Sequence, residues 1–372
     1  MLLRRLLRLS WLAALAGIVV VAPAALAGTW TSPADLSDGA TLIETTDVAS
    51  SSDGRNVAAL WRWQSGGSWM VQATTSADGG RTWATPVNLD IASGTSHWPQ
   101  IASSADGSRL VAIWIGDVGG YATAQAATAT VSGGVATWSL PQDLSATGAP
   151  ASIPTIAMSH DGTKLAAAWE GWNGSDNIIQ ARTATVAGNA ATWSAAQDLS
   201  APGGSALDPS ISGSSSGSSL AVIWRRMSAG HYIVQASTAT VSSNLAAWSP
   251  PQDLSLNTDQ GAYPSIIMSA DGSRLAACWR GQDGVDFKIR ASVATVTTGV
   301  ATWSGPQTIS DVGGHNPSMA ASSDTTRIIL SWTRMSGGAK YIQTSTAEVV
   351  ANLAYWQSPA SVATVDSLQT PA

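Results

Sequence analysis

Three arginines occupy one position of a recurring pattern in this 372-residue sequence. Arg62, Arg225 and Arg280 each follow a tryptophan that ends an apolar segment. Guanidinium groups bind carboxylates through paired hydrogen bonds, so arginines that converge on one point would hold an acidic group of a ligand. The alternative is that they are solvated, or that they form ion pairs with acids such as Glu170 and Asp208.

Aromatic and polar residues accompany these arginines. Some follow the same tryptophans, and others lie just before short apolar segments that begin with proline. Exposed aromatic rings present a large apolar surface on which a sugar ring can stack. The candidate ligand-binding residues are therefore Arg62, Trp63, His97, Trp98, Glu170, Trp172, Asp208, Arg225, Tyr263 and Arg280.

An internal repeat positions these residues. The sequence contains 18 Trp but only five Tyr and one Phe, and one Trp series recurs about every 55 residues. Its segments are TWTSPADLS at Trp30, TWATPVNLD at Trp83, TWSLPQDLS at Trp138, TWSAAQDLS at Trp193, AWSPPQDLS at Trp248, TWSGPQTIS at Trp303 and YWQSPASVA at Trp356. A fixed period of this kind is typical of repeat architectures.

Each repeat contains four short segments rich in Val, Ile, Thr and Trp, separated by turns of Gly, Ser, Asp and Asn. In 262–309 they read YPSIIMS, RLAACW, FKIRASVATV and VATWSGPQTI. Such segments predict antiparallel strands joined by hairpins, and none has a sustained helical period. Four strands per tandem unit predict the blades of a β-propeller.

Six copies of the second segment predict an all-β, six-bladed β-propeller of four-stranded antiparallel blades. These copies end at Trp61, Trp114, Trp169, Trp224, Trp279 and Trp332. The expected blades cover approximately 41–90, 97–145, 151–200, 206–255, 261–310 and 314–363, within one domain of residues 28–372. The additional segment at Trp30 is expected to assist ring closure as an N-terminal strand. Both Trp series are expected to fill the interfaces between blades, and Cys278 to fill the core.

Residues 1–27 have the pattern of a secretory signal. Arg4, Arg5 and Arg8 precede the apolar run WLAALAGIVVVA, and Ala25-Leu26-Ala27 fits a cleavage site. We therefore expect a secreted protein, extracellular, periplasmic or at the cell surface. No later segment is apolar enough to span a bilayer, so no membrane association is expected after cleavage.

Composition limits the classes of partner. Acidic residues outnumber basic ones by 24 to 18, which argues against nucleic acid. The single cysteine excludes an internal disulfide. No spacing of His or Cys suggests a metal site, and no cofactor is expected.

The segment SADGGRTW, residues 76–83, matches the pattern S-x-D-x-G-x-T-W. The carboxylate of Asp78 can accept backbone N–H groups across a tight turn, and glycine allows a positive φ. The segment resembles the Asp-box (bacterial neuraminidase) repeat of sialidase-like propellers, where it joins the third and fourth strands. The resemblance implies a propeller, and activity of sialidase type would need an arginine triad, a Tyr nucleophile, a Glu and an acid/base Asp.

Three functions remain open on the sequence. The first is a binding module for a carbohydrate or another surface polymer. The second is an exo-sialidase-type glycoside hydrolase, for which we assign no catalytic residue because the sialidase aromatic-Arg-Ile-Pro motif is missing. The third is a structural scaffold that binds an extracellular protein. The variable loops between fourth and first strands and between second and third strands share one face, where a ligand would bind.

Overall fold

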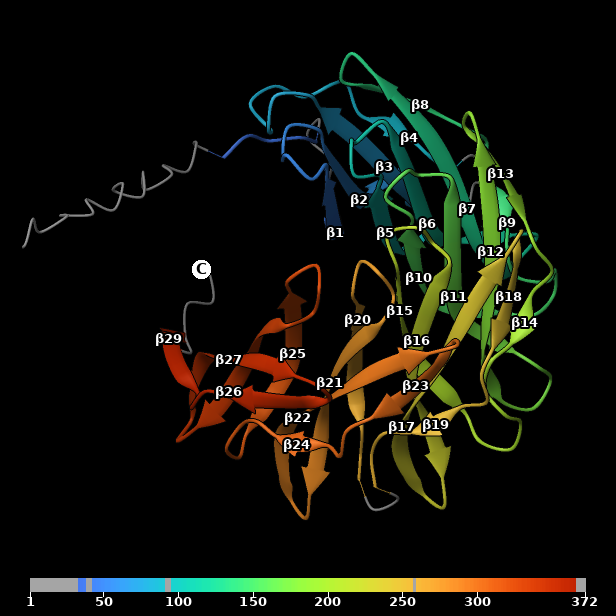
Figure 1. The fold of residues 1–372 in the computed structure, drawn as a ribbon. Helices are drawn as coiled ribbons and strands as arrows, with labels where there is room; N and C mark the ends of the chain where they lie inside the picture. The colour runs from blue at the N-terminus through green and yellow to red at the C-terminus, as the bar shows by residue number, and fades with distance from the viewer. Residues whose placement is uncertain (1–32, 38–41, 91–94, 257–258, 366–372) are drawn as a thin grey trace, which may run out of the picture. The chain divides into compact units, whose positions relative to one another are not determined.

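Six antiparallel sheets, blades 1 to 6, contain all the strands of the described chain, which confirms the predicted all-β six-bladed propeller (Figure 1). The computed structural model describes residues 33–37, 42–90, 95–256 and 259–365. The expected secretory signal and the expected N-terminal strand around Trp30 lie outside these residues. The described residues include no helix with the length and apolar character needed to cross a membrane.

The first three blades contain β1 to β14. Blade 1 consists of β1 (Ile43–Ser50), β2 (Val57–Ser65), β3 (Ser68–Ser76) and β4 (Val87–Asn88). Blade 2 consists of β5 (His97–Ser103), β6 (Arg109–Val118), β7 (Tyr121–Ser132), β8 (Val135–Trp138) and β9 (Gln142–Asp143). Blade 3 consists of β10 (Ala151–Met158), β11 (Lys164–Trp172), β12 (Asn177–Ala187), β13 (Ala190–Trp193) and β14 (Gln197–Asp198).

The last three blades contain β15 to β29. Blade 4 consists of β15 (Ala206–Gly213), β16 (Ser219–Ser228), β17 (His231–Ser242), β18 (Leu245–Trp248) and β19 (Gln252–Asp253). Blade 5 consists of β20 (Ala262–Met268), β21 (Arg274–Asp283), β22 (Asp286–Thr297), β23 (Val300–Trp303) and β24 (Gln307–Thr308). Blade 6 consists of β25 (Gly314–Ala321), β26 (Arg327–Ser336), β27 (Ala339–Val350), β28 (Leu353–Trp356) and β29 (Ala360–Val365).

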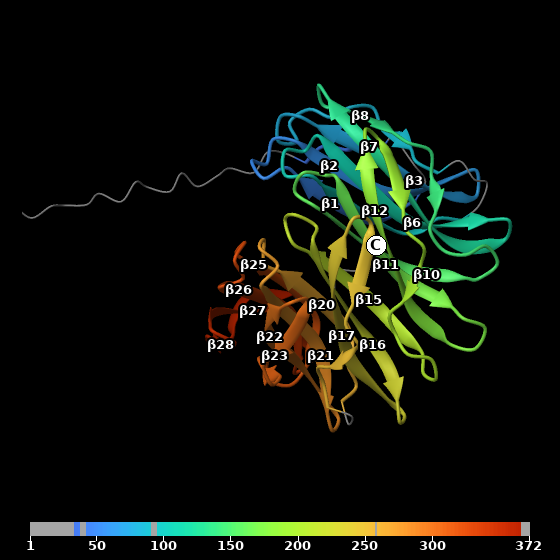
Figure 2. The same cartoon turned by 45° about the vertical axis from the view of Figure 1, so that its right-hand side comes forward.

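Strands pair in chain order within every blade, and successive blades follow one another along the chain (Figure 2). In blades 2 to 6 the fourth strand consists of two short pieces that both pair with the third strand. The fourth strand of blade 6 comes from the C-terminal segment, because β28 and β29 both pair with β27. First strands of successive blades are neighbours, so equivalent positions of the six blades lie along one edge.

The tryptophans of both series in blades 2 to 6 fill the interfaces between blades, as expected. Trp224 and Trp248 of blade 4, for example, belong to one apolar cluster with Ala168 and Ile179 of blade 3. Equivalent clusters join blades 1 and 2, 2 and 3, 4 and 5, and 5 and 6. Cys278 is fully buried in the last of these, and burial raises the pKa of its thiol to about 12, which fits a core position.

A buried polar chain fixes the strand register. In blade 4, Trp224 Nε1 donates to Gln235 Oε1 at 3.2 Å, and Gln235 Nε2 donates to Asp253 Oδ1 at 2.7 Å. The second, third and fourth strands are thereby connected through side chains as well as through the backbone. Trp224 and Gln235 are buried, so leaving either side chain without its partner would cost stability.

Residues 76–83, which we call the Asp78 turn, connect β3 to β4, as the sequence predicts. Asp78 Oδ1 accepts hydrogen bonds from the backbone N–H groups of Arg81 and Thr82, both at 2.9 Å. Asp78 Oδ2 accepts one from Thr82 Oγ1 at 2.7 Å, and Trp83 Nε1 donates to the Gly80 carbonyl at 2.9 Å. Hydrogen bonds from Thr82 and Ser76 lower the pKa of Asp78 to about 2, so the Asp78 carboxylate is ionised at neutral pH.

Candidate functional site

A strained residue recurs in the first strand of every blade. The pairing of each first strand with its second strand is irregular at the same point, and one residue there has a φ between 43° and 55°. These six residues are Thr45, Trp98, Ile153, Asp208, Tyr263 and Asn316. The left-handed region is unfavourable for residues with a Cβ, above all for β-branched ones, and five of the six also precede proline.

The strained position displays a different side chain in each blade. Trp98 remains 44% exposed and Tyr263 50% exposed, although both are large and apolar. A bulge reorients the side chain at the irregular position and interrupts the ladder beside it. Backbone strain that recurs in this way is commonly maintained at binding and catalytic sites. We call the surface that carries the six residues the bulge face.

The three equivalent arginines lie next to the bulges, and aromatic rings hold all three. The guanidinium of Arg62 lies 4.3 Å from the ring centroid of Trp69, that of Arg225 4.5 Å from Tyr232, and that of Arg280 4.3 Å from Phe287. In each case the aromatic residue is the second residue of the third strand, seven positions after the arginine. Stacking restricts the rotamers of the arginines, so these side chains are preorganised.

Arg62 forms contacts within blade 1 and across to blade 2. It forms an ion pair with Glu44, and its Nη1 donates to Nδ1 of His97. Since Nδ1 accepts this bond, His97 is neutral and carries its proton on Nε2. Burial lowers the pKa of His97, and the adjacent Arg62 charge lowers it further. The imidazole next to Trp98 is therefore an uncharged hydrogen-bond donor.

Glu170 and Asp208 connect blades 3 and 4 beside Arg225. Asp208 Oδ2 lies 2.7 Å from Arg225 Nε. Glu170 is only 5% exposed; it accepts hydrogen bonds from Ser152 Oγ at 2.6 Å and from the backbone N–H of Asp208 at 2.8 Å. Burial raises the pKa of Glu170. The carboxylate holds the strained backbone of blade 4 in place, and Asp208 in turn orients Arg225.

Arg280 is surrounded mainly by rings. Its Nη1 lies 3.2 Å from His315 Nδ1, and Tyr263 lies 5.0 Å from the guanidinium on another side. Within the described part of the chain, no carboxylate lies at ion-pair distance from Arg280. Burial lowers the pKa of Arg280, and the charge of Arg225 contributes in the same direction. Blades 4 and 5 therefore present an excess of positive charge beside the exposed ring of Tyr263.

The side chains of the other predicted site residues do not all point to the same side of their strands. Trp63 follows Arg62 in β2 and so lies on the opposite face of that strand, the face of Trp61. Trp172 ends β11 and is 41% exposed. The contacts of Arg62 involve blades 1 and 2, whereas those of Arg225 and Arg280 involve blades 4, 5 and 6. Among the described residues these three arginines have no partner in common.

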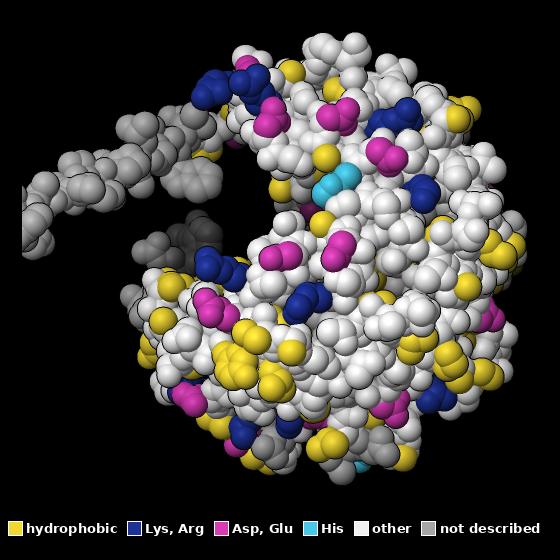
Figure 3. Space-filling model, in the orientation of Figure 1, with side chains coloured by type: hydrophobic (Ala, Val, Ile, Leu, Met, Phe, Trp, Pro, Cys, Tyr) yellow, Lys and Arg dark blue, Asp and Glu magenta, His cyan; other side chains and the backbone are white. Residues whose placement is uncertain are grey.

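Acidic, basic and histidine side chains lie close together around the central part of the face in view in Figure 3. No group of three or more His, Cys, Asp or Glu side chains that could hold a metal ion occurs among the residues that the structure describes. The aromatic, histidine and arginine side chains of the bulge face can stack, form hydrogen bonds and bind anions.

Comparison with known proteins supports the fold. No protein-family model matches the sequence, and no curated protein matches it. Among solved structures, an α-L-arabinanase of Penicillium chrysogenum complexed with arabinobiose is similar, with a TM-score of 0.51 at 12% identity over 82% of this chain and 93% of that one. A protein from Lactobacillus plantarum has a TM-score of 0.53 at 12% identity over 84% and 83%. An ulvan lyase bound to -[GlcA(1-4)Rha3S]- has a TM-score of 0.55 at 10% identity over 83% and 81%.

Proposed function

We propose that this protein binds an acidic glycan on its bulge face. The observation that carries the proposal is the strained position that recurs in six blades and leaves Trp98 and Tyr263 about half exposed. A position that served packing alone would accommodate glycine or would bury its ring. Aromatic rings on a rigid scaffold bind sugars through stacking at a low cost in side-chain entropy.

The positive charge of Arg280 is the reason why we expect the glycan to be acidic. Its charge is held between Tyr263 and Phe287, and no described carboxylate neutralises it. A carboxylate or sulfate group of the glycan would accept hydrogen bonds from the guanidinium while the sugar ring stacks on Tyr263. Arg225, which Asp208 already neutralises, contributes to the field but is not a free anion site.

Two of the similar structures contain carbohydrate, and this supports the same proposal by analogy. The arabinanase holds a neutral disaccharide, and the ulvan lyase holds a glycan with a uronic acid and a sulfated rhamnose. Because identity is only 10–12%, the shared feature is the fold, and the sugar is argued here from the residues of this chain. The pattern of residues 1–27 adds that the protein is secreted and meets its ligand outside the cytoplasm.

Calorimetric titration with polyuronate oligosaccharides tests the proposal. We expect binding by the unmodified protein and its loss in Tyr263→Ala and in Arg280→Gln. The matched control is Arg274→Gln, because Arg274 donates at 2.9 Å to Ala351 in a turn at the opposite end of the strands. Equal affinity in all four proteins, or no affinity for any acidic glycan, would reject the proposal. A fluorogenic sialoside in the same series shows whether binding is followed by hydrolysis.

A further inference from the structure

One face of blade 6 has no neighbouring blade in the part of the chain that the structure describes. Ile328, Leu330 and Trp332 pack against blade 5, so Ile329 points to the other side, where it is 47% exposed. A groove of about 510 Å³ lies there, lined among others by Arg327, Ile329, Thr346 and Glu348. The residues equivalent to Ile329 in blades 1 to 5 belong to apolar clusters shared with the next blade; they are Ala58, Val111, Ala166, Ala221 and Ala276.

A threonine hydroxyl of one blade binds a hairpin of the next at four interfaces. The donors lie fourteen residues after the second-strand Trp, and the acceptor carbonyls lie four residues before the fourth-strand Trp of the next blade. The pairs are Thr75–Gly134, Thr128–Asn189, Thr183–Asn244 and Thr238–Gly299, with distances of 2.6–2.8 Å. Thr346 has the donor position in blade 6 and lies in the groove. By the same count, the acceptor position in blade 1 is Gly79 of the Asp78 turn.

An arginine at the start of the second strand forms a second contact of this kind. Arg109 Nη1 donates to the Gly188 carbonyl at 2.8 Å, and Arg274 Nη1 donates to the Ala351 carbonyl at 2.9 Å. Each acceptor lies five residues before a fourth-strand Trp of the next blade. Arg327 has the donor position in blade 6, and the residue five before Trp83 is Asp78.

The turns between first and second strands form a third series. In each turn one backbone N–H donates to a backbone carbonyl of the next turn at 2.6–2.8 Å. The five donor–acceptor pairs are Ser52–Ala105, Ala105–His160, His160–Ser215, Ser215–Ala270 and Ala270–Ser323. The series begins at Ser52 and ends at Ser323 among the described residues. The Ser323 N–H and the Ser52 carbonyl are the groups that a sixth bond of the series would join.

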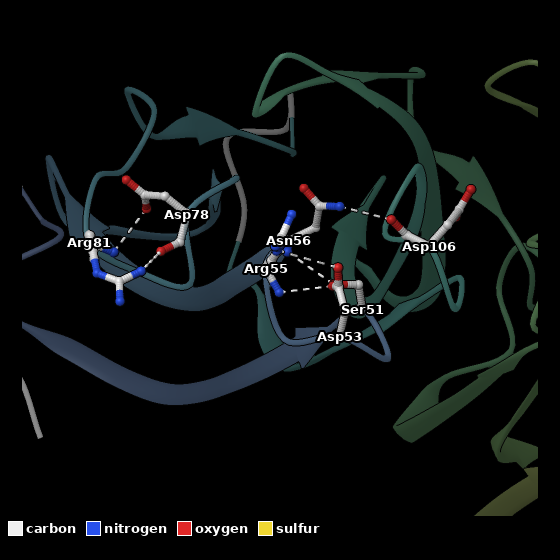
Figure 4. A network of polar contacts seen from close by, with 7 residues as sticks. All are labelled: Ser51, Asp53, Arg55, Asn56, Asp78, Arg81 and Asp106. Carbon is white, nitrogen blue, oxygen red and sulfur yellow. Dashed lines mark hydrogen bonds and ion pairs between the residues drawn. The ribbon is translucent and has the colours of Figure 1, made fainter. Parts of the chain in front are cut away.

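We propose that the groove on blade 6 receives the Asp78 turn of the same chain and thereby closes the ring between blades 6 and 1. Arg327 meets the Asp78 carboxylate, Thr346 Oγ1 donates to the Gly79 carbonyl, and Ser323 N–H donates to Ser52. Figure 4 shows that Arg81, the neighbouring exposed cation, is hydrogen-bonded to the backbone carbonyl of Asp78. In the proposed interface Arg81 meets Glu348. Opposite charges on the two surfaces favour this pairing.

The proposed interface explains why the Asp78 turn occurs in blade 1. The two other interfaces with this arginine use a neutral carbonyl acceptor, and the interfaces between blades 1 to 6 bury alanine or larger apolar side chains. Blade 6 instead has Ser331 and Thr344 where blade 5 has Cys278 and Ala291, so its outer face offers less apolar area. The interface between blades 6 and 1 therefore has less apolar packing, and the ionised Asp78 adds an ion pair with Arg327 in its place.

Disulfide formation between Ser52→Cys and Ser323→Cys tests the proposal. Residues joined by such a backbone bond have Cα atoms close enough for a disulfide. Cys278→Ala removes the native thiol, and Ala168 already occupies the equivalent position in blade 3. The positive control is Ser215→Cys with Ala270→Cys, whose backbones are bonded at 2.8 Å.

We expect the test pair to oxidise within one molecule at a rate within about tenfold of the control pair, which corresponds to ~1.4 kcal/mol. A monomer of increased mobility on a non-reducing gel is the expected product. A covalent dimer would show that the groove receives a second copy, and reduced thiols alongside an oxidised control would show that the Asp78 turn does not dock; either result overturns the proposal.

A charge reversal adds a second measurement on the same cysteine pair. We expect Arg327→Glu to slow disulfide formation several-fold, because it places a like charge beside Asp78. Arg109→Glu, which alters the equivalent arginine of blade 2, is expected to leave the rate unchanged. Equal rates for both charge variants would contradict the assignment of Arg327 to Asp78 even if the ring closes.

Discussion

Glycine and alanine at position 263 should reverse their usual order of stability. Tyr263 has a φ of 52°, and its ring is half exposed. A Cβ in the left-handed region costs about 1–2 kcal/mol. Glycine loses more backbone freedom than alanine on folding, which costs roughly 0.5–1 kcal/mol. The difference predicts that Tyr263→Gly is more stable than Tyr263→Ala by about 0–1.5 kcal/mol, since both variants lose the same ring contact with Arg280.

Urea denaturation followed by tryptophan fluorescence measures this difference. Ser265 is the control, because it lies two residues further along β20 without a positive φ. There the usual order should hold, with Ser265→Ala more stable than Ser265→Gly by roughly 0.5–1 kcal/mol. If glycine is the less stable substitution at both positions, position 263 is not strained, and the argument from strain to function fails.

Four further predictions concern the site and its support. Arg280→Lys should weaken binding of an acidic glycan about tenfold by calorimetry, because an ammonium group cannot stack between rings and form paired hydrogen bonds; unchanged affinity would count against this site. Glu170→Ala should lower the free energy of unfolding by about 1–3 kcal/mol in urea titrations, since two donors lose their acceptor; a neutral effect would mean that water replaces the carboxylate. The pKa of His315 is lowered by burial and by Arg280, so the folded state binds fewer protons than the unfolded state below about pH 6.5. Stability should therefore fall as pH falls through the unfolded pKa, and His315→Gln should flatten a plot of Tm against pH between 7.5 and 5.5. Gln235→Leu should cost about 1–3 kcal/mol by leaving the Trp224 N–H without an acceptor, and a stabilised variant would show that the polar chain is dispensable.

The architecture follows from the sequence because packing repeats. Blades 2 to 6 each pack one second-strand Trp and one fourth-strand Trp against the preceding blade, so the period appears directly in the residue types. The same period placed Arg62, Arg225 and Arg280 at equivalent positions. The carboxylate of Asp78 likewise has the partners that its motif implies.

The finer features of the site depend on geometry that residue types alone do not determine. A proline after Trp98 or Tyr263 marks the end of a loop, but the positive φ that precedes it results from the pairing of two strands. The aromatic partners of the arginines could have been found, because Trp69, Tyr232 and Phe287 each lie seven residues after an arginine. The arginine and the aromatic residue lie on the two strands of a hairpin, so their spacing depends on the length of the hairpin loop. A search for strand or helix periodicity does not detect such a pair.

The most direct test of the account is affinity electrophoresis through a gel that contains a soluble polyuronate, for the unmodified protein and for a triple variant, Trp98→Ala, Tyr263→Ala and Arg280→Gln. The account predicts that the polymer retards the unmodified protein, that salt reduces this effect, and that the triple variant migrates as it does without polymer. Equal retardation of the two proteins, or none of either by any acidic polysaccharide, would show that the bulge face is not a glycan site.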